Sequence, residues 1–355
     1  MIDKKVLLEL ISYGITASSP DNSEPFKFKL SDNEIELRLD PKYLGMFFDA
    51  KCYASLLGCG GVIENIRLRA STMGYRTLVT KHVLDKPLYR VAQLQFEPCE
   101  DSEDPLASAI LKRCTHRGFY ERDKTIPFDL IAGIEQSVEP LSGARVHWFE
   151  GGQRDEITRI ITTTDRIRYT HKSLHDDFYS KLRYGDQIEK SSDGLASDTL
   201  GLESMFTYTL PLLKPWPVAN FLNLIGMHYF MAFRGAKVPL ENANRIGALI
   251  VPKEADELEQ GMTLNRLWLA VNKNEGVHFQ PFGAFPLLIY RMKELNGEGF
   301  NEQQKQFLQT YIQQLEELIE AQPDKERVVI LFRIGYARPP RAFSRRRPVE
   351  SFLIE

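Results

Sequence analysis

The chain has 355 residues, a length that corresponds to about two domains of ordinary size. Hydrophobic residues make up 43% and charged residues 26%, which excludes a disordered, collagen-like or low-complexity chain. The 45 Lys and Arg residues against 48 Asp and Glu residues leave a net charge of −3, so the global charge favours neither nucleic acid nor an anionic membrane.

Hydrophobic periodicity predicts an α+β arrangement in the first hundred residues. The expected elements are, in chain order, a helix over 4–15, a polar loop over 17–26, a hairpin of strands 26–30 and 35–39, a long helix over 50–73, two strands within 75–97 and an acidic linker over 97–104. The long helix contains the glycine-rich run Gly58–Gly61, which favours close packing of two helices over a phosphate-binding loop.

The remainder of the chain alternates helical and extended patterns around one irregular region. The expected elements are a helix near Pro105, a basic run over 111–119, a helix over 128–137, an extended segment over 144–149, an irregular aromatic and apolar region over 165–240, a long helix over 255–276, an amphipathic helix over 302–320 and a buried strand over 328–336.

Residues 215–233 contain no Asp, Glu, Lys or Arg, and by length alone they would suit a transmembrane helix. Prolines, asparagines and a histidine within the run favour a buried helix or an apolar lid instead, so no membrane partner is expected. The apolar N-terminal run carries Glu9 and lacks a cleavage site, which is unlike a signal peptide. Four cysteines without a C-x-x-C pair fit reduced thiols, and we expect a cytoplasmic protein.

A short internal repeat suggests duplication. Gly61, Asn65 and Ala70 recur at the same spacing as Gly261, Asn265 and Ala270, and both copies lie in long expected helices. A duplicated α+β unit is therefore one hypothesis for the fold.

Two basic segments are candidates for binding a phosphate. Arg113, Thr115 and Arg117 combine guanidinium forks with a hydroxyl, although a solvated helix start would show the same residues. Within this motif, Cys114 beside two arginines is a candidate for a reactive thiol with a lowered pKa. The tail run Arg345–Arg347 precedes apolar residues and so predicts a segment that docks on the protein, the alternative being a disordered basic tail that binds RNA.

A metal site receives little support. His171 and His175 lie four residues apart and are followed by two aspartates, but no H-E-x-x-H pattern is present. Exposed polar residues of a helix explain this spacing, and no metal ligand is predicted.

Four segments resemble, in this order, motifs of the nitroreductase superfamily of flavin enzymes, and most closely its long single-chain Acg-like branch. They are ASSPDNSEPF at 17–26, like the A-P-S-x-x-N-x-Q-P-W loop; RCTHRGF at 113–119, like the R-R-S-x-R-x-F phosphate motif; QPFG at 280–283, like the loop beside the flavin ring; and IGY at 334–336 with RRRP at 345–348, like the C-terminal G-Y…R-R-P element. This chain departs from the pattern at Glu24, Phe26, Cys114 and His116.

The resemblance implies an α+β, nitroreductase-like fold of two unequal halves that form a pseudo-dimer within one chain. The halves would be 1–103, with the ring-binding loop, and 104–355, with the phosphate-binding arginines and a lid insertion at about 165–240. The first half lacks the arginine motif and the second lacks the Asn22 loop. One complete site per chain would remain, so a monomer would suffice for cofactor binding.

The resemblance also implies FMN as cofactor, with Arg113, Thr115 and Arg346 at the phosphate, Arg117 near the pyrimidine edge, and Ser19 and Asn22 at ring atoms. The implied cofactor-binding residues are Ser18, Ser19, Asn22, Arg113, Cys114, Thr115, Arg117, Gln280, Pro281, Phe282, Gly283, Arg345, Arg346 and Arg347.

The implied activity is NAD(P)H-linked reduction of a nitroaromatic, a quinone or a related electrophile, with a small molecule as electron acceptor. The flavin would carry the hydride, so no protein side chain is expected to be catalytic. The alternative is a flavin-binding or flavin-storage protein whose lid blocks turnover. A nucleic-acid-binding or peptide-binding role through the arginine tail is a third reading, and no nucleic-acid partner is expected.

Overall fold

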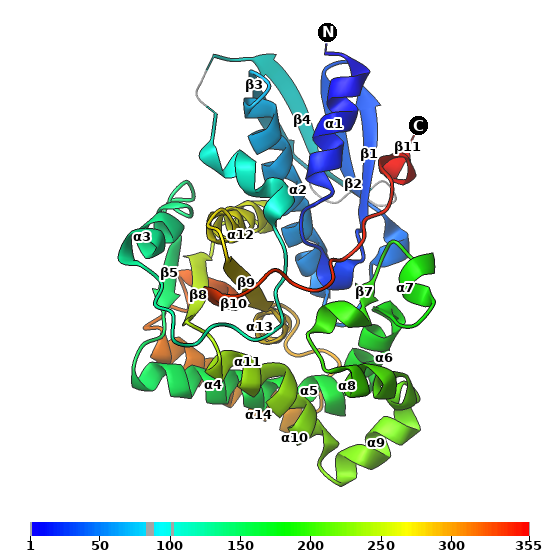
Figure 1. Cartoon of the computed structure of the whole chain (residues 1–355), viewed down its shortest axis with the longest axis vertical. Coiled ribbons are helices and arrows are strands. Elements are labelled where there is room, and N and C mark those ends of the chain that lie inside the picture. Colours follow the sequence, from blue (N-terminus) through cyan, green and yellow to red (C-terminus); the bar gives the residue numbers. More distant parts are fainter. Residues whose placement is uncertain (1, 83–88, 101–102, 355) are drawn as a thin grey trace.

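The computed structural model describes residues 2–82, 89–100 and 103–354 (Figure 1). Its fold is α+β, with two main sheets that are each flanked by a long helix. The first sheet has the order β11-β1-β2-β4-β3 and consists of β1 (Phe26–Ser31), β2 (Glu34–Leu39), β3 (Tyr75–Lys81), β4 (Arg90–Pro98) and β11 (Leu353–Ile354). The second has the order β5-β8-β10-β9 and consists of β5 (Arg145–Trp148), β8 (Arg245–Pro252), β9 (Val277–Phe282) and β10 (Glu326–Tyr336).

Alternation along the strands explains why the first sheet was predictable. In β2, Ile35, Leu37 and Leu39 are buried while their neighbours are half-buried, as a strand with one face on the core requires. In β8, by contrast, residues 246–251 are all buried, because this central strand is covered on both faces. Its continuous apolar run lacks alternation, and the strand was missed.

The helices near the two ends of the chain are long, and those in its middle are short. They are α1 (Lys4–Gly14), α2 (Tyr53–Ser71), α3 (Phe128–Gln136), α4 (Gly152–Asp165), α5 (Ile167–Thr170), α6 (Lys172–Lys181), α7 (Gln187–Lys190), α8 (Ser204–Thr209), α9 (Trp216–Leu224), α10 (Met227–Ala232), α11 (Val238–Glu241), α12 (Glu257–Asn272), α13 (Ala284–Glu294) and α14 (Glu302–Leu318). Two short strands, β6 (Leu182–Arg183) and β7 (Leu195–Ala196), pair in parallel among the short helices.

The long helices α2 and α12 pack against each other between the two sheets (Figure 1). A Cβ atom at Gly60 would collide with the backbone of Gly261, and one at Gly261 would collide with the carbonyl of Leu57. The prediction that the glycine-rich run serves close helix packing is therefore confirmed.

Several expectations are corrected. Residues 165–240 are not irregular but form the short helices α5 to α11, whose brief turns carry no readable period. Helices α4 and α13 and strands β8 and β9 were not predicted. Residues 280–282, expected in a loop, end strand β9. The expected linker over 97–104 begins within β4, and its residues 101 and 102 lie outside the described residues, as do 83–88 between β3 and β4.

The charge-free segment 215–233 is not one buried helix. It forms α9 and α10, joined at Gly226, and many of its apolar side chains are exposed. Over the described ranges, the structure contains no helix that is long and apolar enough to cross a membrane.

The C-terminal tail returns from the second sheet to the first. After β10 it runs between the two halves and ends as β11, which pairs in parallel with β1 through Phe28 opposite Leu353 and Lys29 opposite Ile354 (Figure 1, red). Phe352 is fully buried against the first sheet's core. The prediction that the tail docks is confirmed, and residues 349–354 lie with the first half in space.

Candidate functional site

A cavity of about 940 Å³ is lined by residues within 18–58 together with residues within 113–346. Its wall combines the loop after α1, the N-terminal part of α2, the segment after Lys112, the end of β9, the tail near Arg346, and the helices between 161 and 239. Most of the wall is apolar, with polar groups gathered at a few places, which is the usual composition of a site for a small molecule or cofactor.

Arg113 marks one polar end of this cavity. It follows the 3₁₀ helix Pro105–Lys112, and its guanidinium donates from Nη2 to the carbonyl of Thr16 at 2.9 Å. The guanidinium also lies over the Trp268 ring, 4.7 Å from its centroid. Burial, together with the nearby charge of Arg346, lowers the pKa of Arg113 to about 9, so the side chain stays cationic at neutral pH.

Arg346 approaches the same place from the tail. Its Nε donates to the carbonyl of Ile15 at 3.1 Å and its Nη2 to that of Ala17 at 3.3 Å, while Nη1 donates to Asn22 Oδ1. Burial lowers the pKa of Arg346. The guanidinium groups of Arg113 and Arg346 thus converge on the backbone of residues 15–17.

One carboxylate accompanies the arginines. Glu24 is 1% exposed and pairs with Arg346 at 3.4 Å and with Arg347 at 3.1 Å. Burial raises the pKa of Glu24, while the two arginines act in the opposite direction. Three guanidinium groups against one carboxylate leave this buried cluster with an excess of positive charge. Such an excess fits an anion at the Arg113 and Arg346 end.

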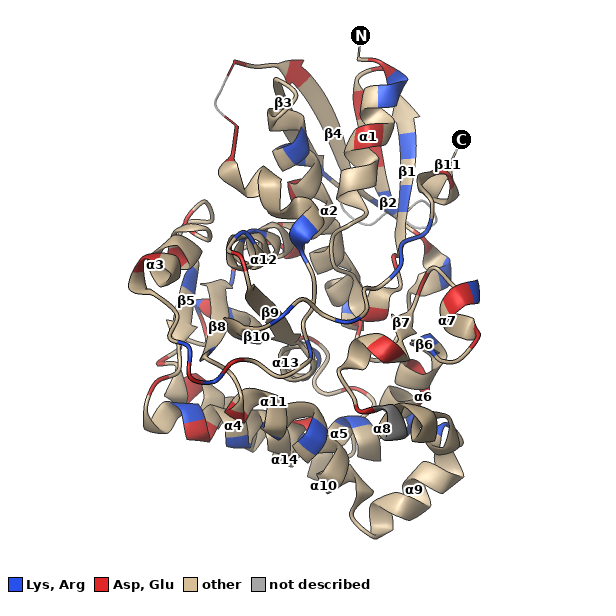
Figure 2. Cartoon of the chain, in the orientation of Figure 1, with Lys and Arg blue, Asp and Glu red and all other residues tan. Residues whose placement is uncertain are grey.

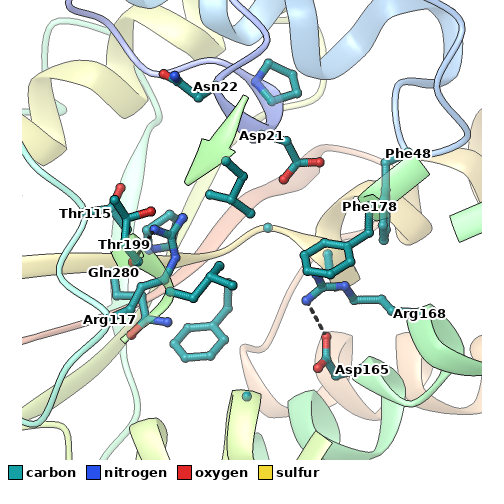
Figure 3. A pocket seen from close by; sticks show the side chains of 18 of the residues that line it. Asp21, Asn22, Phe48, Thr115, Arg117, Asp165, Arg168, Phe178, Thr199 and Gln280 are labelled. Atoms are coloured by element: carbon teal, nitrogen blue, oxygen red, sulfur yellow. Dashed lines mark hydrogen bonds and ion pairs between the residues drawn. The ribbon is translucent and has the colours of Figure 1, made fainter. Parts of the chain in front are cut away.

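Polar groups also line one side of the cavity, and Figure 3 shows Thr115, Arg117, Thr199 and Gln280 grouped at the left of the view. Arg117 donates from Nη1 to the carbonyl of Thr199 at 3.1 Å, and burial lowers its pKa. Gln280 accepts a 2.7 Å hydrogen bond from Nε of the fully buried Arg333. This group presents donors beside an apolar wall.

The opposite part of the cavity carries an acid that sequence reasoning missed. Asp21 points into it, facing Arg168 and Phe178 (Figure 3). Burial raises the pKa of Asp21, opposed by Arg168, Arg117 and Lys181. Its φ of 45° places it in the left-handed region, a strain common at functional sites. Position 21 is a variable one in the motif, so only the fold brings it here.

Most of the predicted cofactor-binding residues line this one cavity. They are Ser18, Ser19, Asn22, Arg113, Cys114, Thr115, Arg117, Gln280, Pro281, Phe282, Gly283 and Arg346.

Two of the predicted cofactor-binding residues, Arg345 and Arg347, make their contacts outside the cavity. Arg345 donates to the carbonyl of Glu189 and Arg347 lies between Glu24 and Tyr43, so neither belongs to the cavity wall. Asn22 lines the cavity, yet its amide nitrogen donates to the carbonyl of Arg345 at 3.1 Å. The loop and the tail therefore hold each other in place.

The structure does not support the hypothesis of a reactive Cys114 thiol. Cys114 is 8% exposed, and burial raises its pKa although Arg113 acts to lower it. Its backbone is fixed by Asn272, which accepts from the amide, and by Trp268, which donates to the carbonyl. The thiol lies 3.7 Å from His278 as part of the packing.

The histidines considered as metal ligands make other contacts. His171 lies 3.0 Å from the carbonyl of Gly299 and His175 lies 2.9 Å from that of Lys214. Among the described residues, the structure contains no group of three or more His, Cys, Asp and Glu side chains that could hold a metal ion.

Comparison with known proteins finds sequence similarity to a mycobacterial protein. No family model matches the chain. A protein of Mycobacterium tuberculosis with the provisional name NAD(P)H nitroreductase Acg is 22% identical over 188 residues, which are 50% of this chain and 54% of that protein. The similarity thus spans about half the length of this curated relative.

Two solved structures align over more of the chain at low similarity. The FMN-dependent nitroreductase NfnB from Mycobacterium smegmatis, in complex with NADPH, is 16% identical with a TM-score of 0.35, covering 67% of this chain and 94% of that one. Nitroreductase A from Vibrio parahaemolyticus is 11% identical with a TM-score of 0.35, covering 70% and 75%. With the order of the motifs, the similarity to the mycobacterial protein confirms the resemblance of this chain to the nitroreductase superfamily.

Proposed function

We propose that the cavity binds one FMN per chain and that the protein is an FMN-dependent NAD(P)H oxidoreductase. The observation that carries the proposal is the buried excess of positive charge at Arg113 and Arg346, at one end of a largely apolar cavity. A phosphate ester with about two negative charges at neutral pH matches that excess. The name of the mycobacterial relative supports the nicotinamide part of the proposal.

The residues of the chain fit this cofactor. Arg113 and Arg346 would hold the phosphate by charge-assisted hydrogen bonds. Thr115, Arg117 and Gln280 are grouped on one side of the cavity in Figure 3 and would face the polar edge of the ring. A buried guanidinium there favours negative charge nearby, and so would stabilise a reduced cofactor.

When bound, FMN supplies hydride transfer between a nicotinamide and an acceptor. The chain then has to bind, orient and exclude water, and no nucleophile or metal is required of it. The acceptor would be a nitroaromatic, a quinone or a related electrophile, because Phe48 and Phe178 form an aromatic wall at the far end of the cavity (Figure 3).

The same proposal covers the domain organisation. Residues 1–103 and 104–355 would stand in for the two subunits of a dimer, with the lid at about 165–240 belonging to the second. Supporting this, the carbonyl of Thr16 from the first half accepts hydrogen bonds from Arg113 of the second. A monomer would then suffice for binding.

A second candidate is a flavin-binding or flavin-storage protein. It is favoured by the extent of the lid, since residues of α4 to α11 and their connections form a large share of the cavity wall. If the lid stays closed, an acceptor cannot reach the ring.

Anaerobic titration of the purified protein with NADH and NADPH tests the two candidates. The proposed reductase should be yellow and should bleach on addition of one nicotinamide, with the colour returning when menadione or a nitroaromatic is added. A yellow protein that does not bleach would favour storage, and a colourless protein that takes up no added FMN would contradict both.

A further inference from the structure

Exposed apolar side chains gather on one part of the surface. Among the described residues, fourteen large hydrophobic side chains are exposed, and nine of them lie between residues 208 and 233. We call these nine the apolar face: Tyr208, Leu212, Val218, Phe221, Leu224, Ile225, Tyr229, Phe230 and Phe233. Soluble surfaces carry scattered apolar residues, whereas a concentrated patch marks an interaction site.

Helices α9 and α10 under this face carry few polar side chains and no charged ones. Figure 2 shows α9 without a charged residue, and its polar side chains are Asn220 and Asn223. Leu222 and Met227 line the cavity on the inner side, while Leu224 and Ile225 are 80% and 74% exposed on the outer side. A helix with apolar residues on both its inner and its outer side is suited to apolar contacts on both sides.

The cavity reaches the surface through this face. Leu212, Val218 and Phe230 line the cavity and are also 68%, 42% and 43% exposed. They therefore form an apolar rim that joins the interior of the site to the exterior. A ligand that crosses this rim need not pass a charged group on it.

The segment that carries the face contains basic residues and no acidic ones. From 204 to 240 the chain contains Lys214, Arg234 and Lys237 but no Asp or Glu. Arg234 pairs with Glu203 and Lys237 with Glu241 at the ends of the segment. Within the described part of the chain, Lys214 and Arg166 have no ion pair, and Arg166 lies 3.8 Å from the Tyr229 ring centroid. The uncompensated charge beside the apolar face is positive.

The exposed apolar side chains and the positive charge beside them indicate what binds to the apolar face. A second copy would bring the same positive, acid-free segment against itself, which like charges oppose. An anionic lipid surface offers apolar depth for the exposed side chains and negative headgroups for Lys214 and Arg166. Tyr208 and Tyr229 are of the type that prefers the boundary between lipid and water.

We propose that the apolar face docks on an anionic lipid surface, lying in it without crossing it, and that the cavity takes a lipid-soluble acceptor across its rim. The docking is argued from the apolar face alone. That the lipid-soluble molecule is an electron acceptor rests on the proposed function. It revises the expectation from the sequence that the chain has no membrane partner.

Co-sedimentation with vesicles tests the docking. The purified protein is mixed with phosphatidylcholine vesicles, with and without phosphatidylglycerol, and its mass in solution is measured in parallel. The test variant is Leu224→Ser with Ile225→Ser, since neither residue lines the cavity. The matched control is Phe128→Ser, which removes an 86% exposed side chain from α3, away from the face.

The wild-type protein and Phe128→Ser should bind the anionic vesicles equally, and the double variant should bind with an affinity lower by about tenfold for each side chain removed. Lys214→Gln should weaken binding to anionic vesicles more than to neutral ones. Equal binding by the double variant, no binding by the wild type, or a dimer that the double variant splits would overturn the proposal.

A separate measurement addresses the acceptor. A long-chain quinone embedded in the anionic vesicles should be reduced faster by the wild type than by the double variant, while water-soluble 1,4-benzoquinone is reduced equally by both. Failure of vesicle binding counts against docking alone, because it needs no flavin. If the wild-type protein binds the vesicles but reduces neither quinone, the result counts against the proposed reductase.

Discussion

Asn265 donates a hydrogen bond from Nδ2 to Oδ1 of Asn65 at 2.8 Å, across the contact between α12 and α2. Both residues are buried, and they occupy the same place in the two copies of the internal repeat. Equivalent residues that meet each other are expected where two related units face one another across a twofold axis. The contact supports the hypothesis of duplication with one shared interface.

Replacing Gly261 with Ala should destabilise the fold by about 1–3 kcal/mol or more, because the added methyl overlaps the Leu57 carbonyl across the helix contact. The control is Gly133→Ala in α3, where a Cβ meets no atom within 4 Å and alanine is the better helix former. Urea unfolding followed by circular dichroism compares the two. Equal stability of both variants would show that α2 and α12 are not packed this closely.

Replacing both Arg113 and Arg346 with Gln should raise the dissociation constant for FMN by about a hundredfold or more, since a hydrogen bond to a charged group contributes roughly 1.5–3 kcal/mol. Fluorescence quenching of added FMN measures it. Arg345→Gln is the control, because its guanidinium bonds the Glu189 carbonyl outside the cavity. Unchanged binding in a folded double variant would remove the phosphate assignment.

How far the sequence predicted the site depends on the kind of residue. Arg113 and Arg346 lie more than two hundred residues apart, yet their motifs predicted both, and the structure brings both to the wall of one cavity. Their role at a phosphate stays a prediction. Asp21 and Arg168 were missed, because an acid and an arginine outside any recognised motif carry no signal in the sequence. Only the fold brings both to the cavity wall. Arg345 and Arg347 were assigned to the cofactor because adjacent arginines cannot be told apart by composition.

Stability should fall as the pH drops below about 6.5. Burial and the adjacent His278 lower the pKa of His116 from 6.5 to about 4. Between these values the unfolded chain binds more protons, so stability is full above the window and is lost by up to about 1.4 kcal/mol for each pH unit through it. Urea unfolding across the window measures the slope.

His116→Gln is the companion variant, since its amide can still donate to the Arg338 carbonyl that His116 contacts at 3.0 Å. The variant should show a shallower fall of stability over the same window. A slope identical to that of the wild type would mean that His116 titrates normally in the folded protein.

Of the thiols of Cys52, Cys99 and Cys114, that of Cys114 should react most slowly. Its pKa is raised by burial, whereas Cys52 and Cys99 are only half-buried. Brief alkylation with iodoacetamide in the native state, followed by peptide mass spectrometry, should label Cys52 and Cys99 well before Cys114. Preferential labelling of Cys114 would restore it as a nucleophile candidate.

The fold was predictable where periodicity was clean. The hairpin β1–β2 and helices α1, α2, α12 and α14 have one buried side each or a clear start and end, and they were found within a few residues. Strand β8 and the short helices between residues 165 and 240 were not, because the first is buried on both faces and the others are too brief to show a period. The return of β11 to the first sheet is a long-range pairing that no local pattern encodes.

The most direct test of the single-chain site is the ratio of flavin to protein, measured with mass in solution at low concentration. The account predicts one FMN per chain on a particle of 40.8 kDa, with the flavin retained on dilution. Two FMN per chain, or flavin lost as a larger assembly dissociates to monomers, would contradict a site built from the two halves of one chain.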